Sequence, residues 1–188
     1  MITAISIIAA TLIGVGIICA AVLALLAAGN DAPRRAPLRR PPSASESYID
    51  RTASWAATAR TDSAASPGSV LRVLTEQPYL NRLPFVTGPL PLAAGRRVTR
   101  TPLIGYEEEV VVRIPDREYA TVGTGISIPL TIESFAQRFR IEPSGNGSRI
   151  EWTVAVTPKF IGWLPLRWTG FIARPVMRIV LAAALRGA

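Results

Sequence analysis

The sequence predicts an α+β fold, in which an antiparallel sheet is covered on one side by a long C-terminal helix, preceded by one N-terminal transmembrane helix. Three observations predict it: an uncharged apolar run over 2–28, alternating strand-like patterns between 96 and 157, and a helical pattern over 164–186. A chain of 188 residues holds one ordinary domain besides an anchor. We therefore divide it into a transmembrane helix (1–28), a basic proline-rich linker (29–49) and a folded domain (50–188).

The apolar run is long enough to cross a bilayer, since a spanning helix needs about 20 apolar residues. A cleaved signal peptide would start with basic residues and have a shorter apolar core, and this chain has neither feature. No basic residue precedes the run, and four follow it: Arg34, Arg35, Arg39 and Arg40. The positive-inside rule then predicts a single-pass protein of the cytoplasmic membrane, with its domain in the cytoplasm and these arginines beside membrane lipids.

The linker region contains four prolines among arginine, alanine and serine between residues 29 and 47. This composition favours an extended, partly disordered tether over packed structure.

Composition also excludes several functions. The net charge of +8 is scattered, without a basic run interleaved with aromatic residues, so we expect no nucleic-acid partner. The single cysteine, Cys19, excludes an internal disulfide and a cysteine-based zinc cluster. Histidine is absent from the sequence, which removes the usual general base and the commonest metal ligand. We therefore expect no metal and no cofactor.

The folded domain begins with a strand over 54–61. Ser66 and Pro67 then supply an N-cap and a first-turn proline for a helix that ends near Glu76, and a short helical segment follows over 79–83. The later chain alternates, which predicts five strands: 96–101, 106–114, 117–124, 131–142 and 149–157. The sequence of residues 143–148, rich in glycine and asparagine, predicts a tight turn between the last two strands.

The last two strands each carry one apolar face, formed by Phe135, Phe139 and Ile141 on one strand and by Ile150, Trp152, Val154 and Val156 on the other. A sheet covered on one side follows. At 3.6 residues per turn the C-terminal helix places one apolar set together: Ile172, Val176, Ile179, Val180 and Ala183. Arg167, Arg174 and Arg178 lie nearly opposite, and Pro175 is expected to kink or split the helix.

Three stretches carry a family resemblance: 55–77 as an opening strand and helix, 109–119 as a central hairpin, and 139–152 as a late hairpin. In this order, and with a long C-terminal helix, residues 50–188 resemble the START-like (SRPBCC) superfamily. That superfamily includes polyketide cyclases, lipid-transfer domains and plant pathogenesis-related ligand binders. The tryptophan often found after the early helices is absent here, where Leu83, Pro84 and Phe85 stand.

The resemblance implies a helix-grip fold, whose sheet wraps around the long helix and leaves a cavity for apolar molecules. Carried over, the lining would be Phe135, Phe139, Trp152, Val154, Ile172, Val176 and Ile179. Glu133 and Gln137 share strand parity with the two phenylalanines, so they are the candidates to orient a ligand. The alternatives remain open: the same apolar residues also suit a closed core, and either polar side chain also suits a strand end in water.

Two further groups have competing interpretations. Trp163, Trp168 and Phe171 precede or begin the last helix and suit either a bilayer surface or the lid of the core. Glu107, Glu108 and Glu109 alternate sides on a strand, cannot form one cluster, and suit a solvated strand edge.

Our leading hypothesis is a non-enzymatic, membrane-anchored carrier or sensor for a lipid, isoprenoid or polyketide-like molecule, without catalytic residues. The second is a cyclase or dehydratase acting on aromatic intermediates, which requires Glu133, Gln137 or Tyr119 to converge in the cavity. The third is an accessory subunit whose filled shell docks on a membrane protein.

Overall fold

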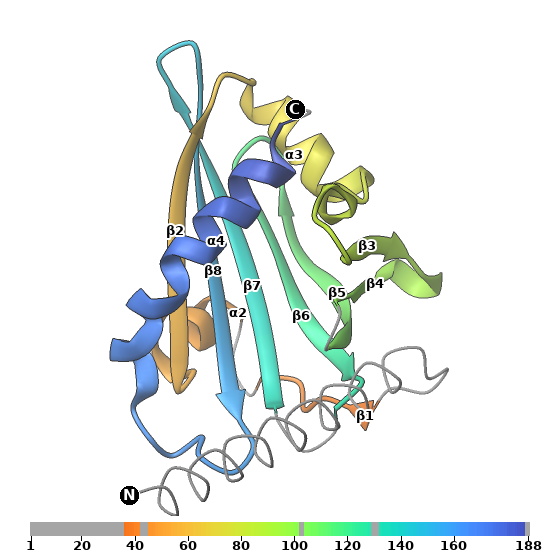
Figure 1. Ribbon diagram of the computed structural model, residues 1–188, viewed down its shortest axis with the longest axis vertical. Helices are drawn as coiled ribbons and strands as arrows, with labels where there is room; N and C mark the ends of the chain where they lie inside the picture. The colour runs from red at the N-terminus through yellow and green to blue at the C-terminus, as the bar shows by residue number, and fades with distance from the viewer. Residues whose placement is uncertain (1–35, 42–44, 102–103, 129–131, 187–188) are drawn as a thin grey trace, which may run out of the picture.

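The structure is a computed structural model that describes residues 36–41, 45–101, 104–128 and 132–186 (Figure 1). The predicted membrane-spanning segment, together with Arg34 and Arg35, lies outside the described residues. Within the described ranges no helix is both long enough and apolar enough to span a bilayer.

The domain is built on one antiparallel sheet, as the sequence predicts, with spatial order β2-β8-β7-β6-β5-β4-β3 and with β1 paired to β6. The strands are β1 (Ala36–Pro37), β2 (Trp55–Ser63), β3 (Thr87–Pro91), β4 (Arg96–Arg100), β5 (Gly105–Ile114), β6 (Glu118–Ile126), β7 (Ile132–Ser144) and β8 (Gly147–Pro158). From β3 to β8, each strand pairs with the next one in the sequence, and β2 forms the other edge of the sheet by pairing with β8.

The helices lie on both sides of the sheet (Figure 1). They are α2 (Ser45–Ser47), η1 (Tyr48–Thr52), α3 (Pro67–Glu76), η2 (Tyr79–Arg82), η3 (Ala93–Gly95), η4 (Leu166–Thr169) and α4 (Gly170–Ala184). Ser66 caps α3 as predicted, because its hydroxyl accepts a hydrogen bond from the Ser69 amide at 3.4 Å. We call the side covered by α3 and α4 the inner face and the side covered by η1 the outer face.

The C-terminal helix forms where predicted, but the prediction of its buried side is wrong. Gly170, Met177, Leu181 and Ala184 face the sheet. Ile172, Val176 and Ile179 are instead 65%, 63% and 68% exposed. Pro175 lies inside the helix and does not split it.

Close packing on β2 explains this difference. A Cβ atom on Gly170 would collide with the carbonyl oxygen of Ala56, so the backbones of α4 and β2 are nearly in contact there. Ala57 and Ala59 meet Met177 and Ala173 farther along, so small residues line the interface. Bulky Ile and Val side chains do not fit into this gap, and the helix turns them outward.

Part of the predicted linker packs against the domain. Residues 36–39 lie where β6 and β7 separate: the Leu38 amide donates to the Thr124 carbonyl at 3.1 Å, and the Arg39 amide donates to the Glu133 carbonyl at 2.9 Å. The Leu38 side chain reaches the inner face beside Phe135, at a place left open by Gly123. These backbone hydrogen bonds give the segment a fixed position that a free tether does not have.

The outer face is covered by η1, which also falls at the end of the predicted linker. Tyr48 and Ile49 are buried there against Val122, Ala136 and Ala155. The Tyr48 hydroxyl lies 2.9 Å from the Ser134 hydroxyl and 3.0 Å from the Thr157 hydroxyl, and it donates to the Ser134 carbonyl at 3.0 Å. The domain therefore starts before residue 50.

An ion pair fastens η1 to the sheet. Both carboxylate oxygens of Asp50 accept hydrogen bonds from Arg138, at 2.6 and 3.1 Å. These hydrogen bonds lower the pKa of Asp50 from its ordinary value of 3.8.

We expect Gly170→Ala to destabilise the domain by about 1–3 kcal/mol, because the added methyl group must push α4 away from β2. Alanine would otherwise favour the helix, so a loss of stability reports the close contact specifically. Denaturant unfolding of the full-length protein in detergent measures the change. Ile172→Ala, on the exposed side of the same helix, is the control and is expected to cost less than about 0.5 kcal/mol. Equal effects of the two substitutions would contradict the close packing.

We expect the contribution of Asp50 to stability to depend on pH. Because the pKa of Asp50 is lower in the folded than in the unfolded protein, its stabilising contribution is present above the unfolded value of 3.8 and is lost as the pH falls through the folded value. The unfolding midpoint of Asp50→Asn should therefore lie below that of the wild type near neutral pH, and the two should converge toward about pH 2. A difference that persists in acid would show that Asp50 acts in another way.

Candidate functional site

The inner face carries a cluster of aromatic rings beneath α3, η2 and α4. Phe139 lies at its centre and stacks on Trp152, with ring centroids 5.6 Å apart and planes 3° from parallel. Tyr79 meets Phe139 edge-on at 6.4 Å, and Tyr119 lies 6.3 Å away on the other side. Buried aliphatic residues of α3, α4 and the sheet surround the rings: Val70, Leu71, Val73, Leu74, Ile141, Ile150, Leu181 and Leu185.

Beside these rings, a chain of polar side chains crosses five neighbouring strands. Glu108 of β5 is 1% exposed and is its centre. One carboxylate oxygen accepts from Arg97 of β4 at 2.7 Å, and the other accepts from Thr121 of β6 at 2.9 Å and from Gln137 of β7 at 2.6 Å. The amide oxygen of Gln137 then accepts from the Trp152 indole of β8 at 3.0 Å. These hydrogen bonds join the ion pair between Arg97 of β4 and Glu108 of β5 to the aromatic cluster.

The two charged members of this side-chain network, Arg97 and Glu108, are both buried and pair with each other. Burial opposes the charge on the Arg97 guanidinium, but the Glu108 carboxylate together with the nearby Tyr119 and Tyr79 hydroxyls favours it, and the net effect raises the pKa of Arg97. Arg97 also donates to the Leu74 carbonyl of α3 at 2.9 Å, and its guanidinium carbon lies 4.9 Å from the centroid of the Tyr119 ring. Hydrogen bonds from Thr121 and Gln137 to Glu108, and from Arg97 to Leu74, offset part of the cost of burying this ion pair.

Two donors in this region remain unused. The Tyr119 hydroxyl and Nε of Arg97 are buried and have no hydrogen-bond partner among the described residues. Burial raises the pKa of Tyr119, so its hydroxyl keeps its proton at neutral pH. Each group can donate to an acceptor that enters the inner face, and leaving it unpaired costs about 1–3 kcal/mol.

Three of the predicted site residues come together here, because Trp152 contacts both Phe139 and Gln137. Val154 lies next to them, in the small cluster that packs under Met177 of α4. Phe135 is half-buried farther along β7, where its ring meets Tyr106 at 5.4 Å.

The remaining predicted residues lie elsewhere. Glu133 forms an ion pair with Arg39 at 2.9 Å near the start of β7. The helix residues proposed to line the cavity, Ile172, Val176 and Ile179, point away from the sheet because α4 presents its small residues to β2.

Sequence reasoning missed Glu108 and Arg97. Glu107, Glu108 and Glu109 do alternate sides as expected, but the interpretation of all three as a solvated edge is wrong for Glu108, which is buried. A signal for this existed, because three consecutive acids on a strand must place the middle one on the face opposite to its neighbours. The register that sets Arg97 opposite Glu108 was not readable from spacing alone.

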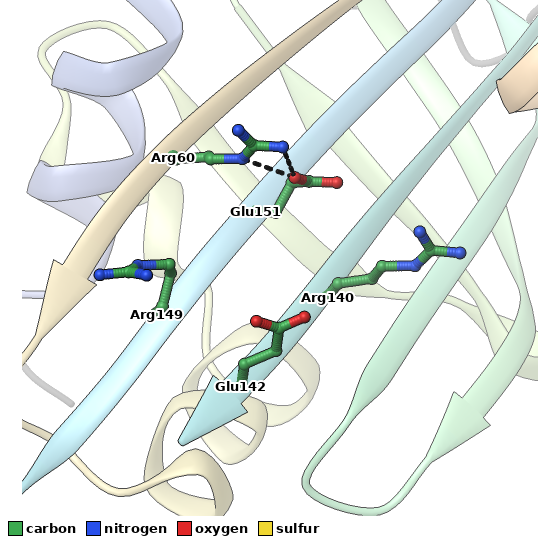
Figure 2. A pocket seen from close by; sticks show the side chains of 5 residues that line it. All are labelled: Arg60, Arg140, Glu142, Arg149 and Glu151. Carbon is green, nitrogen blue, oxygen red and sulfur yellow. Dashed lines mark hydrogen bonds and ion pairs between the residues drawn. The ribbon is translucent and has the colours of Figure 1, made fainter. Parts of the chain in front are cut away.

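The outer face carries a charged depression of about 510 Å³, lined by Arg60, Arg140, Glu142, Arg149 and Glu151 (Figure 2). Arg60 and Glu151 form an ion pair at 2.6 Å across β2 and β8, and Arg149 pairs with Asp62 at 3.0 Å. Arg140 lies 3.5 Å from Glu118. Four of these five charged side chains, all except Glu142, already pair within the protein on a solvated face, so the inner face is the stronger candidate site.

Comparison with known proteins adds a family and a fold. Residues 54–188 match the sequence profile of the family described as polyketide cyclase / dehydrase and lipid transport. Among curated proteins, a search with this sequence finds no match.

Several solved structures share the fold. A START superfamily protein from Mycobacterium smegmatis has a TM-score of 0.54 and 17% identity, covering 70% of this chain and 94% of its own. XoxI from Bacillus cereus has a TM-score of 0.51 and 16% identity, covering 70% and 94%. A protein from Chromobacterium violaceum has a TM-score of 0.51 and 12% identity, covering 71% and 98%. At these identities the likeness establishes the START-like fold alone.

We expect Glu108→Gln to destabilise the protein by about 3–5 kcal/mol, because it leaves the buried Arg97 guanidinium without a counter-charge. The double variant Arg97→Met/Glu108→Gln removes both charges and should recover part of that loss. Unfolding of the full-length protein in denaturant measures both. A double variant that is as unstable as Glu108→Gln alone, or less stable, would contradict the coupling.

Proposed function

We propose that this chain, a member of the polyketide cyclase / dehydrase and lipid transport family, binds an apolar small molecule that carries a hydrogen-bond acceptor. The binding site would lie on the inner face of the sheet, beneath α3 and α4. This proposal builds on the START-like fold, whose members typically bind hydrophobic ligands.

One observation carries the proposal: two unpaired buried donors, the Tyr119 hydroxyl and Nε of Arg97, stand beside the aromatic cluster of Phe139 and Trp152. Apolar walls with a few oriented polar groups are the usual composition of a small-molecule site. An acceptor on the ligand would complete the hydrogen bonding that the protein leaves unmade.

Local charge narrows the ligand class. The positive charge of Arg97 is already matched by Glu108 at 2.7 Å. A ligand carboxylate would therefore add an unmatched negative charge in a buried site, at a high desolvation cost. We propose a neutral acceptor, such as the carbonyl or hydroxyl of a lipid, an isoprenoid or a polyketide-like molecule.

Carriage or sensing fits these side chains better than catalysis. Both carboxylate oxygens of Glu108 already accept hydrogen bonds, from three donors within the protein, so the carboxylate is held in place and turned toward protein groups. The cyclase alternative requires Glu133, Gln137 or Tyr119 to act on a common substrate, and Glu133 is held by Arg39 at 2.9 Å instead.

We also propose that this binding takes place at the cytoplasmic face of a membrane. The support is in the sequence: the uncharged run over 2–28 and the arginines that follow it. Of these, Arg39 and Arg40 lie near Glu133 and Glu109, at 2.9 and 3.8 Å, so Arg34 and Arg35 are the better candidates to meet anionic lipid.

Native mass spectrometry of the full-length protein, extracted in mild detergent, tests the proposed function. We expect one neutral, apolar species bound near one per chain. An empty protein that also refuses a panel of lipids and isoprenoids would overturn the proposal and favour an accessory subunit that docks on a membrane protein.

We expect Tyr119→Phe to weaken binding of the recovered ligand by about fivefold to tenfold while leaving stability unchanged or slightly higher, because an unpaired buried hydroxyl is removed. Tyr48→Phe, on the outer face, is the matched control: its hydroxyl contacts Ser134 and Thr157, so it should lose about 1–3 kcal/mol of stability and no affinity. Ligand titration and denaturant unfolding measure the two effects. Unchanged affinity in Tyr119→Phe would remove this hydroxyl from the site.

A further inference from the structure

The outward side of α4 is unusually apolar for a solvent-facing surface. Trp168, Ile172, Val176 and Ile179 are all exposed and follow one another at intervals of four and three residues, and exposed Phe171 lies next to Ile172. That spacing places them in one stripe along the helix, continuous with η4.

The opposite side of the same helix is also apolar, because Met177, Leu181 and Ala184 are buried against the sheet and α3. A helix that is apolar on two opposite sides is normally covered on both. An exposed stripe of this kind marks an interaction surface.

The loop that leads into η4 extends this stripe. Phe160, Ile161 and Trp163 are exposed there, and Trp163 and Trp168 are 79% and 72% exposed. Tryptophan at an exposed apolar surface is typical of the membrane–water interface, where its ring sits at the level of the lipid head groups.

A basic flank borders the stripe. Arg174 and Arg178 are one helical turn apart on α4 and line a groove with Thr58, Arg60 and Glu151. Neither forms an ion pair with another described residue, and Lys159 adds an exposed cation next to Phe160. An apolar stripe with aromatic residues and a basic flank suits the surface of an anionic bilayer.

The position of β1 also favours a membrane contact at this end of the domain. β1 lies at the end of the sheet where β8 leads into the aromatic loop (Figure 1). Residues 29–35 separate β1 from the predicted membrane span, and seven extended residues reach at most roughly 25 Å. This distance limit rests on the membrane anchor proposed above, whereas the apolar stripe and the basic flank are independent of the anchor.

We propose that the outward side of α4, together with the loop over 159–165, lies in the surface of an anionic lipid bilayer. Phe171, Ile172, Val176 and Ile179 enter the boundary between head groups and acyl chains, and Arg174 and Arg178 face lipid phosphates. This contact places α4, which covers the proposed ligand site, directly against the membrane.

The protein's own tryptophans test the contact. Full-length protein is reconstituted into vesicles of phosphatidylcholine and phosphatidylglycerol with brominated acyl chains, which quench fluorescence only at close range. Of the four tryptophans, Trp163 and Trp168 are exposed, whereas Trp55 and Trp152 are half-buried in the domain. We expect Trp163→Phe/Trp168→Phe to reduce the quenched intensity at least about threefold. Quenching that is absent in wild type, or unchanged in this variant, overturns the proposal.

A charge-matched pair of variants tests the stripe itself. Ile172→Glu/Ile179→Glu should reduce quenching at least about twofold, since charged groups resist entry into the acyl region. Arg72→Glu, an exposed position on α3, changes the net charge by the same amount and should leave quenching unchanged. Both retain the core, which circular dichroism checks. An equal loss in the two variants would indicate a general charge effect and contradict a specific contact.

Further variants test the basic flank of Arg174 and Arg178 and two other possible occupants of the stripe: the apolar run over 2–28 and a second copy of this chain. Arg174→Gln/Arg178→Gln should weaken quenching on anionic vesicles and have little effect on phosphatidylcholine alone.

Val176→Cys provides a crosslinking site in addition to the single native Cys19. A crosslink to Cys19 would show that the apolar run over 2–28 covers the stripe, and a crosslink between two copies would show a dimer. Either result overturns the bilayer contact without affecting ligand binding in native mass spectrometry.

Discussion

The hydrogen bonds of the buried Glu108 carboxylate are the constraint on which the inner face depends. Its donors come from β4, β6 and β7, so three strands must hold their register relative to β5 for the charge to be satisfied. A slip of one residue would turn every side chain of a strand to the other face and leave the carboxylate buried without partners. Because an unpaired buried charge is costly, the Glu108 carboxylate favours a single register of these strands and a single arrangement of the candidate site.

The same interior joins the sheet to the helices. Arg97 pairs with Glu108 and donates to the Leu74 carbonyl, so the charged pair also positions α3. Gln137 connects Glu108 to the Trp152 indole, and Trp152 stacks on Phe139. Polar and aromatic parts of the site are thus held by one another, which suits a preorganised binding surface more than a flexible one.

The close approach of α4 to β2 has a consequence on the other side of the helix. Because the backbones of α4 and β2 nearly touch at Gly170, Met177 is the long apolar side chain of α4 that packs against β2, and Ile172, Val176 and Ile179 turn outward. The packing that closes the domain therefore creates the exposed stripe proposed to meet the bilayer. The proposed ligand site and the proposed membrane-binding stripe lie on opposite sides of this one helix, which offers a short physical route between them.

The sequence by itself determined the order of the main elements from β2 to α4 apart from β3, the antiparallel sheet, the cap of α3 at Ser66 and the START-like family, because these depend on local periodicity and turn chemistry. It also indicated that Phe139 and Gln137 share one face of their strand and that Trp152 lies on the apolar face of the next, since strand parity is a local property. Only the tertiary structure decided that Glu108 meets Arg97, that Leu38 and Tyr48 belong to the domain, and that Ile172, Val176 and Ile179 face outward. These facts depend on register and on backbone separation between distant segments, and neither is encoded in the pattern of one segment.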